Sequence, residues 1–299
     1  MAQTAALLTR TALALGLSAL ASVAAAAPPG TLPYGAYDPG GDYADDPEVV
    51  IEHLFVPWQD VYLPSLVEAD AYARERNRAL LVTLEPWTWT RSERNTPEEL
   101  RTGIASGAYD EYMSAVCSVL ATLDSPVTLR WAHEMENSNG QFIWSNWNPP
   151  DYVAAFQHMT SLCRGLASNI RVMWSPAGDP GLEAYYPGDA YVDLVGLSVF
   201  GLQANDLLEV GRARGFAETL APRYARAAAF GKPVVVAELG FSGDAAYVAA
   251  WDSAVRTVGD QFPNLVGVVY FNQREVYPWP NDFGLPDWRL DHRVIDPAE

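Results

Sequence analysis

Basic side chains are scarce in this sequence, and their scarcity argues against several functions. The 299 residues include 19 Lys plus Arg against 37 Asp plus Glu, which gives a formal net charge of −18. A surface of that sign repels phosphate backbones and acidic polysaccharides, so we expect no nucleic-acid partner and favour a neutral one. Lys232 is the one lysine, and it precedes an apolar run instead of ending it, which argues against Schiff-base chemistry.

Motifs of several common enzyme classes are missing as well. The segment HEMEN (133–137) lacks the second histidine of an H-E-x-x-H zinc site, and no G-x-S-x-G nucleophile elbow occurs. The segment YDPGGDY (37–43) does not have the G-x-G-x-x-G spacing of a dinucleotide site. We therefore expect neither a metal site nor a cofactor.

Long apolar stretches are confined to the N-terminus. Arg10, the apolar residues 11–20 and the small residues that end near Ala27 are typical of a cleaved signal peptide. The apolar core is about ten residues long, whereas a membrane-spanning helix needs roughly 20. We therefore expect residues 1–27 to be a signal peptide and the protein to be secreted or periplasmic, without stable membrane association. Residues 28–299 contain no linker or repeat, which predicts one domain, and we expect a monomer.

Cysteine is rare too, with Cys117 and Cys163 as the two examples, each inside a helical pattern. In an oxidising compartment the two can form a disulfide, which would stabilise the fold by roughly 3–4 kcal/mol through the entropy of the unfolded loop. Two buried free thiols are the alternative.

Short apolar runs alternate with amphipathic segments along the mature chain. The runs are residues 33–37, 49–56, 78–87, 126–135, 170–178, 191–200, 232–241 and 265–272, and most intervals between them carry helical periodicity. Near-continuous apolar strands that alternate with helices indicate a parallel sheet buried on both faces. Eight such units favour an α/β fold of the closed (β/α)8 TIM barrel type.

Several of these predicted strands end in functional side chains, at the barrel face where active sites gather. Glu134 and Glu238 each follow an apolar run directly. Two carboxylates over one barrel mouth can hydrolyse a glycosidic bond, since one protonates the leaving oxygen and the other attacks the anomeric carbon. A purely structural ion pair between Glu134 and Arg130 is the alternative, because residues 130, 132 and 134 would share one strand face.

The segment RWAHEMENSNGQFIW (130–144) resembles the R-x-x-H-E-M-N-G-x-W segment of glycoside hydrolase family 26. The segments LLVTLEPW, VMWSPAG, KPVVVAELG and DWRLD support this resemblance, which runs from about residue 33 to 291. It implies a catalytic domain over residues 28–299 that hydrolyses with retention, with Glu134 as general acid/base and Glu238 as nucleophile. It further implies His133 and Arg130 as supports of the two glutamates, and Trp87 and Trp174 as walls of the sugar cleft. A barrel-core role for Trp174 is the alternative.

Three departures from the family pattern fall on sugar-binding positions. The residues ENS (136–138) intervene after HEM, so that Phe142 falls at the family tryptophan and Trp144 is a candidate substitute. Phe200 stands where the family commonly has a tyrosine that hydrogen-bonds the nucleophile. Tyr270 replaces a tryptophan at the end of the last strand, where Asn272 follows as a further candidate for substrate contact.

The expected substrate is a neutral β-linked polysaccharide, cut internally. The resemblance implies β-1,4-mannan first, with a mixed-linkage or other β-glucan as the alternative because the changed positions all touch the sugar. A non-catalytic barrel that only binds polysaccharide is a further alternative, motivated by Phe200.

Overall fold

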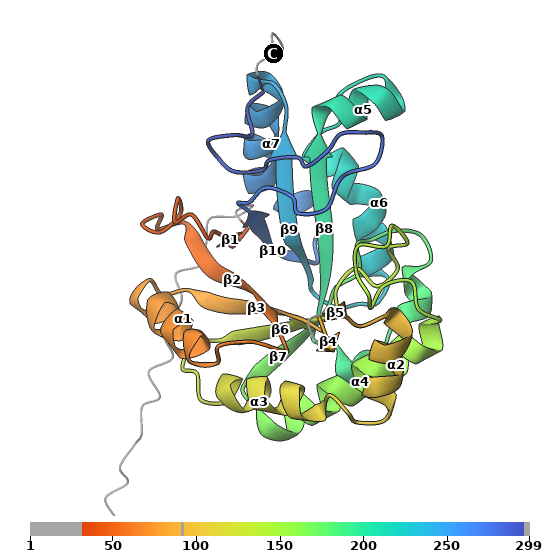
Figure 1. Ribbon diagram of the computed structural model, residues 1–299. Coiled ribbons are helices and arrows are strands. Elements are labelled where there is room, and N and C mark those ends of the chain that lie inside the picture. The colour runs from red at the N-terminus through yellow and green to blue at the C-terminus, as the bar shows by residue number, and fades with distance from the viewer. Residues whose placement is uncertain (1–31, 91–92, 296–299) are drawn as a thin grey trace, which may run out of the picture.

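The computed structural model describes residues 32–90 and 93–295, so that the expected signal peptide, residues 1–27, lies outside the described residues (Figure 1). Parallel strands form a closed barrel in the order β1-β10-β9-β8-β7-β6-β3-β2. The barrel strands are β1 (Tyr34–Tyr37), β2 (Val49–Pro57), β3 (Ala79–Glu85), β6 (Val127–Trp131), β7 (Ile170–Trp174), β8 (Leu194–Leu202), β9 (Val234–Ser242) and β10 (Leu265–Phe271). The predicted (β/α)8 architecture is confirmed.

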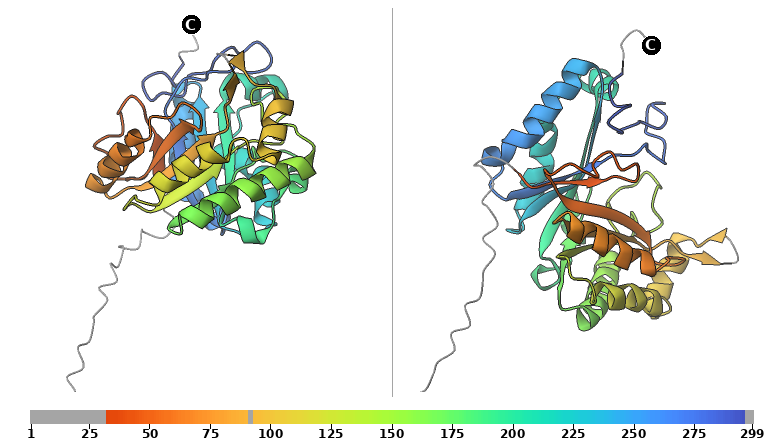
Figure 2. Two further views of the ribbon diagram at one scale, coloured as in Figure 1. Left: turned by 60° about the horizontal axis from the view of Figure 1, so that its bottom comes forward. Right: turned by 90° about the vertical axis from the view of Figure 1, so that its left-hand side faces the viewer.

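Helices surround these strands on the outside (Figure 2). They are α1 (Pro64–Glu75), α2 (Pro97–Ala105), α3 (Asp110–Leu120), α4 (Pro149–Leu166), α5 (Gln203–Val210), α6 (Phe216–Ala228) and α7 (Ala245–Thr257), with the short 3-10 turns η1 (Leu182–Tyr185), η2 (Asp189–Tyr191) and η3 (Val258–Gln261). A hairpin of β4 (Trp89–Thr90) and β5 (Glu93–Arg94), which the sequence pattern did not predict, follows β3. Within the described ranges, no helix has the length and apolar character that crossing a membrane requires.

The barrel interior changes from apolar to polar along its axis. Alternate residues of a strand point to opposite faces, so Leu81 points inward with Met173 and Val235 in a small apolar cluster. Two residues further along β3, Thr83 is fully buried but polar and contacts Arg130 of β6. The carboxyl ends of the strands therefore carry the polar groups, over an apolar base.

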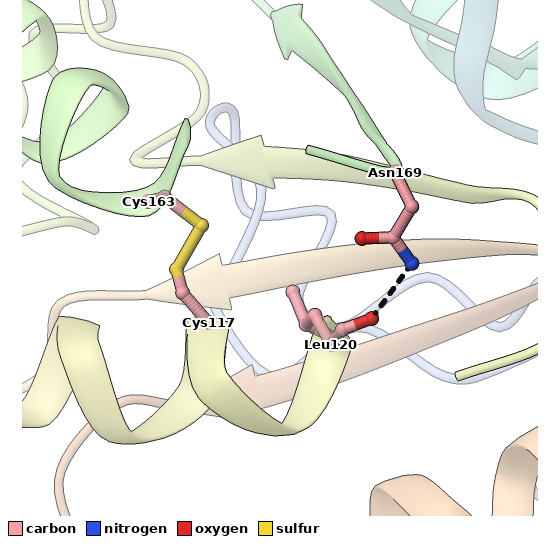
Figure 3. The surroundings of a disulfide bond; sticks show 4 residues. All are labelled: Cys117, Leu120, Cys163 and Asn169. Atoms are coloured by element: carbon pink, nitrogen blue, oxygen red, sulfur yellow. Dashed lines mark hydrogen bonds between the residues drawn. A yellow bond between two sulfur atoms is a disulfide. The ribbon is translucent and has the colours of Figure 1, made fainter. Parts of the chain in front are cut away.

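A disulfide joins α3 to α4 outside the barrel (Figure 3), so the bridged alternative for the two cysteines is confirmed. Cys117 and Cys163 are both fully buried and lie 46 residues apart in sequence. Nearby, the Asn169 side chain donates a hydrogen bond of 3.1 Å to the carbonyl oxygen of Leu120, at the end of α3. The disulfide and this hydrogen bond fix α3 against the α4–β7 segment.

We expect reduction of this disulfide to lower the free energy of unfolding by about 3–4 kcal/mol, since the loop it closes no longer restrains the unfolded chain. For a domain of this size that corresponds to a fall in Tm of about 10 °C. Calorimetry with and without reductant measures the effect, and the Cys117→Ala/Cys163→Ala variant is the control, because reductant should not change its Tm. An unchanged midpoint in the parent protein would contradict the prediction.

Candidate active site

Arg130 occupies the centre of the polar end of the barrel. Its side chain is fully buried, and its Nη1 atom lies 2.6 Å from Oε1 of Glu238. The guanidinium also donates to the hydroxyls of Ser175 (2.8 Å) and Thr83 (3.2 Å). The expected alternative of an Arg130–Glu134 ion pair is therefore wrong, since the carboxylate beside Arg130 belongs to Glu238.

Backbone geometry explains why Glu134 does not share a face with Arg130. Strand β6 ends at Trp131, and the next residues turn through left-handed conformations, with φ of 46° at Ala132 and 54° at Glu134. Such conformations are uncommon for residues other than glycine and often occur at functional sites. The Glu134 amide donates to the carbonyl oxygen of Ser175 at 2.8 Å, which fixes the turn to the end of β7.

Glu134 is half-buried and lies close enough to Glu238 for the two side chains to interact electrostatically. Burial raises the pKa of Glu134 to about 8, the negative charge of Glu238 acts in the same direction, and the Ser198 hydroxyl acts against them. Glu134 therefore holds its proton more tightly than an ordinary carboxyl group does. A protonated carboxyl beside an ion-paired one is the arrangement that a general acid and a nucleophile require.

A β-bulge turns Glu238 into the site. Val235 and Ala237 of β9 both point into the barrel, so simple alternation would place Leu239 inward and Glu238 outward. The register between β8 and β9 shifts at this point, from Leu197↔Val236 to Ser198↔Glu238. Bulges re-aim side chains in this way near active sites.

His133 lies beside Glu238, with its Nε2 atom 3.8 Å from Oε1 of that residue. Burial, and to a lesser extent the positive charge of Arg130, hold the pKa of His133 well below its ordinary value, so the ring is neutral. The Phe142 ring meets it edge to face, with centroids 4.7 Å apart. His133 thus contributes shape and a dipole to the site, but no charge.

Glu134 and Glu238 line the same pocket, which has a volume of about 440 Å³. Of the other expected residues, Phe142 and Phe200 line it as well. Phe200 pairs with Gly240 in the β8–β9 register, two residues beyond Glu238 on β9. The structure therefore brings the two glutamates together with both phenylalanines that depart from the family pattern.

Three expected sugar-binding rings are fully buried, which contradicts direct contact with substrate for Trp144 and Tyr270 and agrees with the barrel-core alternative for Trp174. Trp144 donates its indole N–H to the carbonyl oxygen of His133 at 2.7 Å. Trp174 packs edge to face against Tyr186, and the Tyr270 hydroxyl donates to the carbonyl oxygen of Trp288. A ring without an exposed face cannot stack on a sugar, and all three rings belong to the hydrophobic core.

Trp87 and Asn272 do not line the pocket either. The guanidinium carbon of Arg94 lies 3.9 Å from the centre of the Trp87 ring, which is half-buried. Asn272 is buried and donates hydrogen bonds to Asp38 (2.7 Å) and Asp42 (2.8 Å), so it fixes the loop after β1.

Two glutamates that the prediction left out also lie near Glu238. Burial raises the pKa of Glu85 to about 7, and also that of Glu275 to about 7, with the charge of Glu238 acting in the same direction on each. Glu275 lines the pocket and accepts the Trp288 indole N–H at 2.9 Å. The sequence signal for Glu85 was its place at a strand end. Glu275 lies in a loop, and the sequence has no periodic pattern there from which its position could be predicted.

The pocket also contains a tryptophan that the sequence reasoning missed. Trp279, in the loop after β10, lines the pocket and lies edge to face with Phe200 at 6.3 Å. The place of the segment YPWP (277–280) in the loop after a barrel strand is an available signal, because binding residues often lie on such loops.

We expect Arg130→Met to lower the free energy of unfolding by about 3–5 kcal/mol at pH 7, because it leaves the Glu238 carboxylate buried without its cation. Chemical denaturation measures this loss. Adding Glu238→Gln to the variant should restore part of the stability, since the unpaired charge is then removed as well. Equal losses in the single and double variants would show that the two residues are not energetically coupled.

Comparison with known proteins gives matches at the level of family, sequence and fold. Residues 100–271 match the family model of glycosyl hydrolase family 26. A β-1,3-xylanase from Vibrio sp. is 36% identical over 107 residues, and one from Alcaligenes sp. is 35% identical over the same length. In both cases the match covers 33% of this chain and 22% of the relative. The chain thus matches less than a quarter of the length of these two curated relatives.

Solved structures resemble this barrel at low sequence identity. An endo-β-1,4-mannanase from Cellulomonas fimi has a TM-score of 0.65 and 15% identity, with 90% of this chain and 68% of that chain covered. The catalytic domain of an endo-β-1,4-mannanase from Bacillus sp. has a TM-score of 0.62 and 16% identity, with 86% and 80% covered. At such identities the likeness shows the fold.

Proposed function

Because the chain belongs to glycosyl hydrolase family 26, we propose that it hydrolyses β-glycosidic bonds of a neutral polysaccharide with retention. One observation carries the proposal. Glu134 and Glu238 line one pocket in opposite environments, since burial keeps Glu134 protonated while Arg130 lies 2.6 Å from Glu238. When two neighbouring carboxyl groups have environments that move their pKa values apart, the protonated group is the candidate acid and the ionised group is the candidate nucleophile.

The reaction then proceeds in two displacements. In the first, a Glu238 oxygen bonds to the anomeric carbon, the bond to the leaving oxygen breaks, and the proton of Glu134 passes to that oxygen. In the second, the Glu134 carboxylate takes a proton from water, the water oxygen bonds to the anomeric carbon, and the Glu238 carboxylate leaves. Each displacement inverts the anomeric carbon, so the product retains the configuration of the substrate.

Two substrates are proposed, in order. β-1,4-Mannan comes first because it is the substrate that the resemblance to the family implies. β-1,3-Xylan is the second, because two relatives named β-1,3-xylanases share 36% and 35% identity with the chain over 107 residues. Phe142 and Phe200, which line the pocket, are the residues whose replacement should redistribute activity between the two.

Product release from galactomannan, β-1,3-xylan, lichenan and carboxymethylcellulose tests the proposal, with Glu134→Ala and Glu238→Ala beside the parent protein. Release by the parent, lost in both variants, supports the proposed pair, and the polysaccharide that is cut identifies the substrate. NMR of the first product shows its anomeric configuration. Binding without release from any substrate would instead favour a non-catalytic polysaccharide-binding barrel.

We also propose that the protein is exported after cleavage near Ala27 and functions as a monomer. The segment from Arg10 to Ala27 supports export, and the disulfide suits an oxidising compartment. N-terminal sequencing of the protein from periplasm or medium tests the cleavage, and an intact Met1 there would contradict it. Light scattering in solution gives the mass, and a mass above that of one chain would contradict the monomer.

A further inference from the structure

Two loops meet above the pocket. The loop after β6, residues 137–141, and the loop after β10, residues 273–288, are joined by a hydrogen bond of 2.9 Å from the Tyr277 hydroxyl to the carbonyl oxygen of Asn139. We call these two loops and this bond the mouth bridge. In the closed strand order three strands lie between β6 and β10 in either direction, so the mouth bridge joins opposite sides of the barrel. The colours of Figure 1 mark the two loops as the yellow-green segment after β6 and the dark-blue segment after β10.

Both sides of the mouth bridge are held in place by their own hydrogen bonds. On the β6 side, the Asn137 side chain accepts from the Asn139 amide at 3.0 Å, and the Asn139 side chain accepts from the Gln141 amide at 2.8 Å. On the β10 side the chain doubles back, with antiparallel pairs Arg274↔Asp287 and Trp279↔Gly284. The mouth bridge is therefore organised before substrate arrives.

The pocket lies on one side of the barrel mouth. Its lining residues come from β8, β9 and the segments that follow β6, β7, β8 and β10, and among the described residues none comes from β1, β2, β3 or the segments that follow those three strands. Glu134 and its loop line the pocket together with Asp179 after β7 and Arg223 of α6. Since Glu134 protonates the leaving oxygen, the pocket extends on the leaving-group side.

Aromatic rings occupy the other side. Tyr37 at the end of β1 lies 4.8 Å from Phe55 of β2 and 5.3 Å from Phe271 of β10, measured between ring centres. Phe55 reaches His133 at 6.0 Å, and His133 contacts Phe142. These rings line the sector between β10 and β6 that contains β1, β2 and β3, where Tyr37, Phe55 and Phe271 are half-buried.

We propose that the protein removes single sugars from the non-reducing ends of its polysaccharide, because the pocket that contains both glutamates lies on one side of the barrel mouth and the mouth bridge spans that mouth. This inference rests on the proposed function. A chain bound across the whole mouth would have to pass the hydrogen bond between Tyr277 and Asn139 and then cross the rings on the far side. A chain end avoids both, with its terminal sugar between Glu134 and Glu238 and the remaining chain toward Asp179 and Arg223. The mode differs from the internal cleavage that the family resemblance implies.

Borohydride-reduced mannopentaose and β-1,3-xylopentaose, with the p-nitrophenyl β-glycosides of mannose and xylose, test the proposal. The expected first products are a monosaccharide and the tetrasaccharide alditol, together with hydrolysis of one p-nitrophenyl monosaccharide. A disaccharide or trisaccharide as first product would overturn the release of single sugars from the chain end while leaving the proposed hydrolase intact. No turnover of any pentasaccharide or aryl glycoside, together with no release from the four polysaccharides above, would overturn both.

The Tyr277→Phe variant tests the mouth bridge itself, because it removes the donated hydrogen bond and keeps the ring. We expect the ratio of internal to terminal first cuts to rise roughly three- to tenfold, the size of effect that one hydrogen bond supports. Tyr72→Phe, on α1, is the matched control and should leave the ratio unchanged. If the ratio and the melting temperature are both unchanged in Tyr277→Phe, the hydrogen bond of the mouth bridge does not determine whether the protein cuts at chain ends.

Discussion

Glu238→Ala is expected to lower kcat by roughly 10⁴-fold or more, with little change in substrate binding, since removing a nucleophile commonly costs that much. The variant has no atom that can bond to the anomeric carbon, and Arg130 is left without the carboxylate that lies 2.6 Å from it. Initial rates on the polysaccharide that the parent cuts measure the loss. Glu68→Ala, which removes an exposed glutamate on α1, is the matched control and should retain full activity.

Azide distinguishes loss of the nucleophile from simple loss of structure. In Glu238→Ala, azide can occupy the space of the carboxylate and attack an activated aryl glycoside from the same face. The product should then be a glycosyl azide of inverted configuration, because one displacement has replaced two. A folded variant that retains more than a tenth of parental activity without azide would assign the nucleophile elsewhere.

The barrel could be predicted because its strands are buried on both faces, which leaves a run of apolar residues that sequence shows directly. All nine residues of β9 are buried, for example. The expectation that both glutamates lie at strand ends is met by Glu134, which follows β6 (Val127–Trp131), but not by Glu238, which lies in the middle of β9 (Val234–Ser242). Their orientations could not be predicted, because both depend on departures from regular alternation: the left-handed φ values at Ala132 and Glu134, and the bulge before Glu238.

The aromatic assignments failed for a different physical reason. A tryptophan near a strand end suits both a sugar platform and a core position, and only the path of the loops decides which face remains open. Trp144 is buried because the loop after β6 folds back so that its indole donates to His133, whereas Trp279 lines the pocket because its loop turns inward. No short-range pattern encodes either path.

The pH dependence of the first displacement should come from Glu134. Its pKa of about 8 means that kcat/KM should stay level from neutral pH up to about 8, and then fall about tenfold per pH unit as the proton is lost. The value of kcat/KM falls as pH rises because a general acid must be protonated in the free enzyme. A rise in kcat/KM above pH 8 would contradict that assignment.

Glu134→Gln should lower kcat/KM by roughly 10²- to 10⁴-fold for natural glycosidic bonds, which need a proton on the leaving oxygen. For a dinitrophenyl glycoside, whose leaving group needs none, kcat/KM should stay near the parental value and lose its fall above pH 8. Glu275→Gln is the matched control, since it makes the same change in the same pocket at a carboxyl with a pKa of about 7. That variant should keep the fall above pH 8. If kcat/KM no longer falls above pH 8 in Glu275→Gln but still falls in Glu134→Gln, then the general acid is Glu275 and not Glu134.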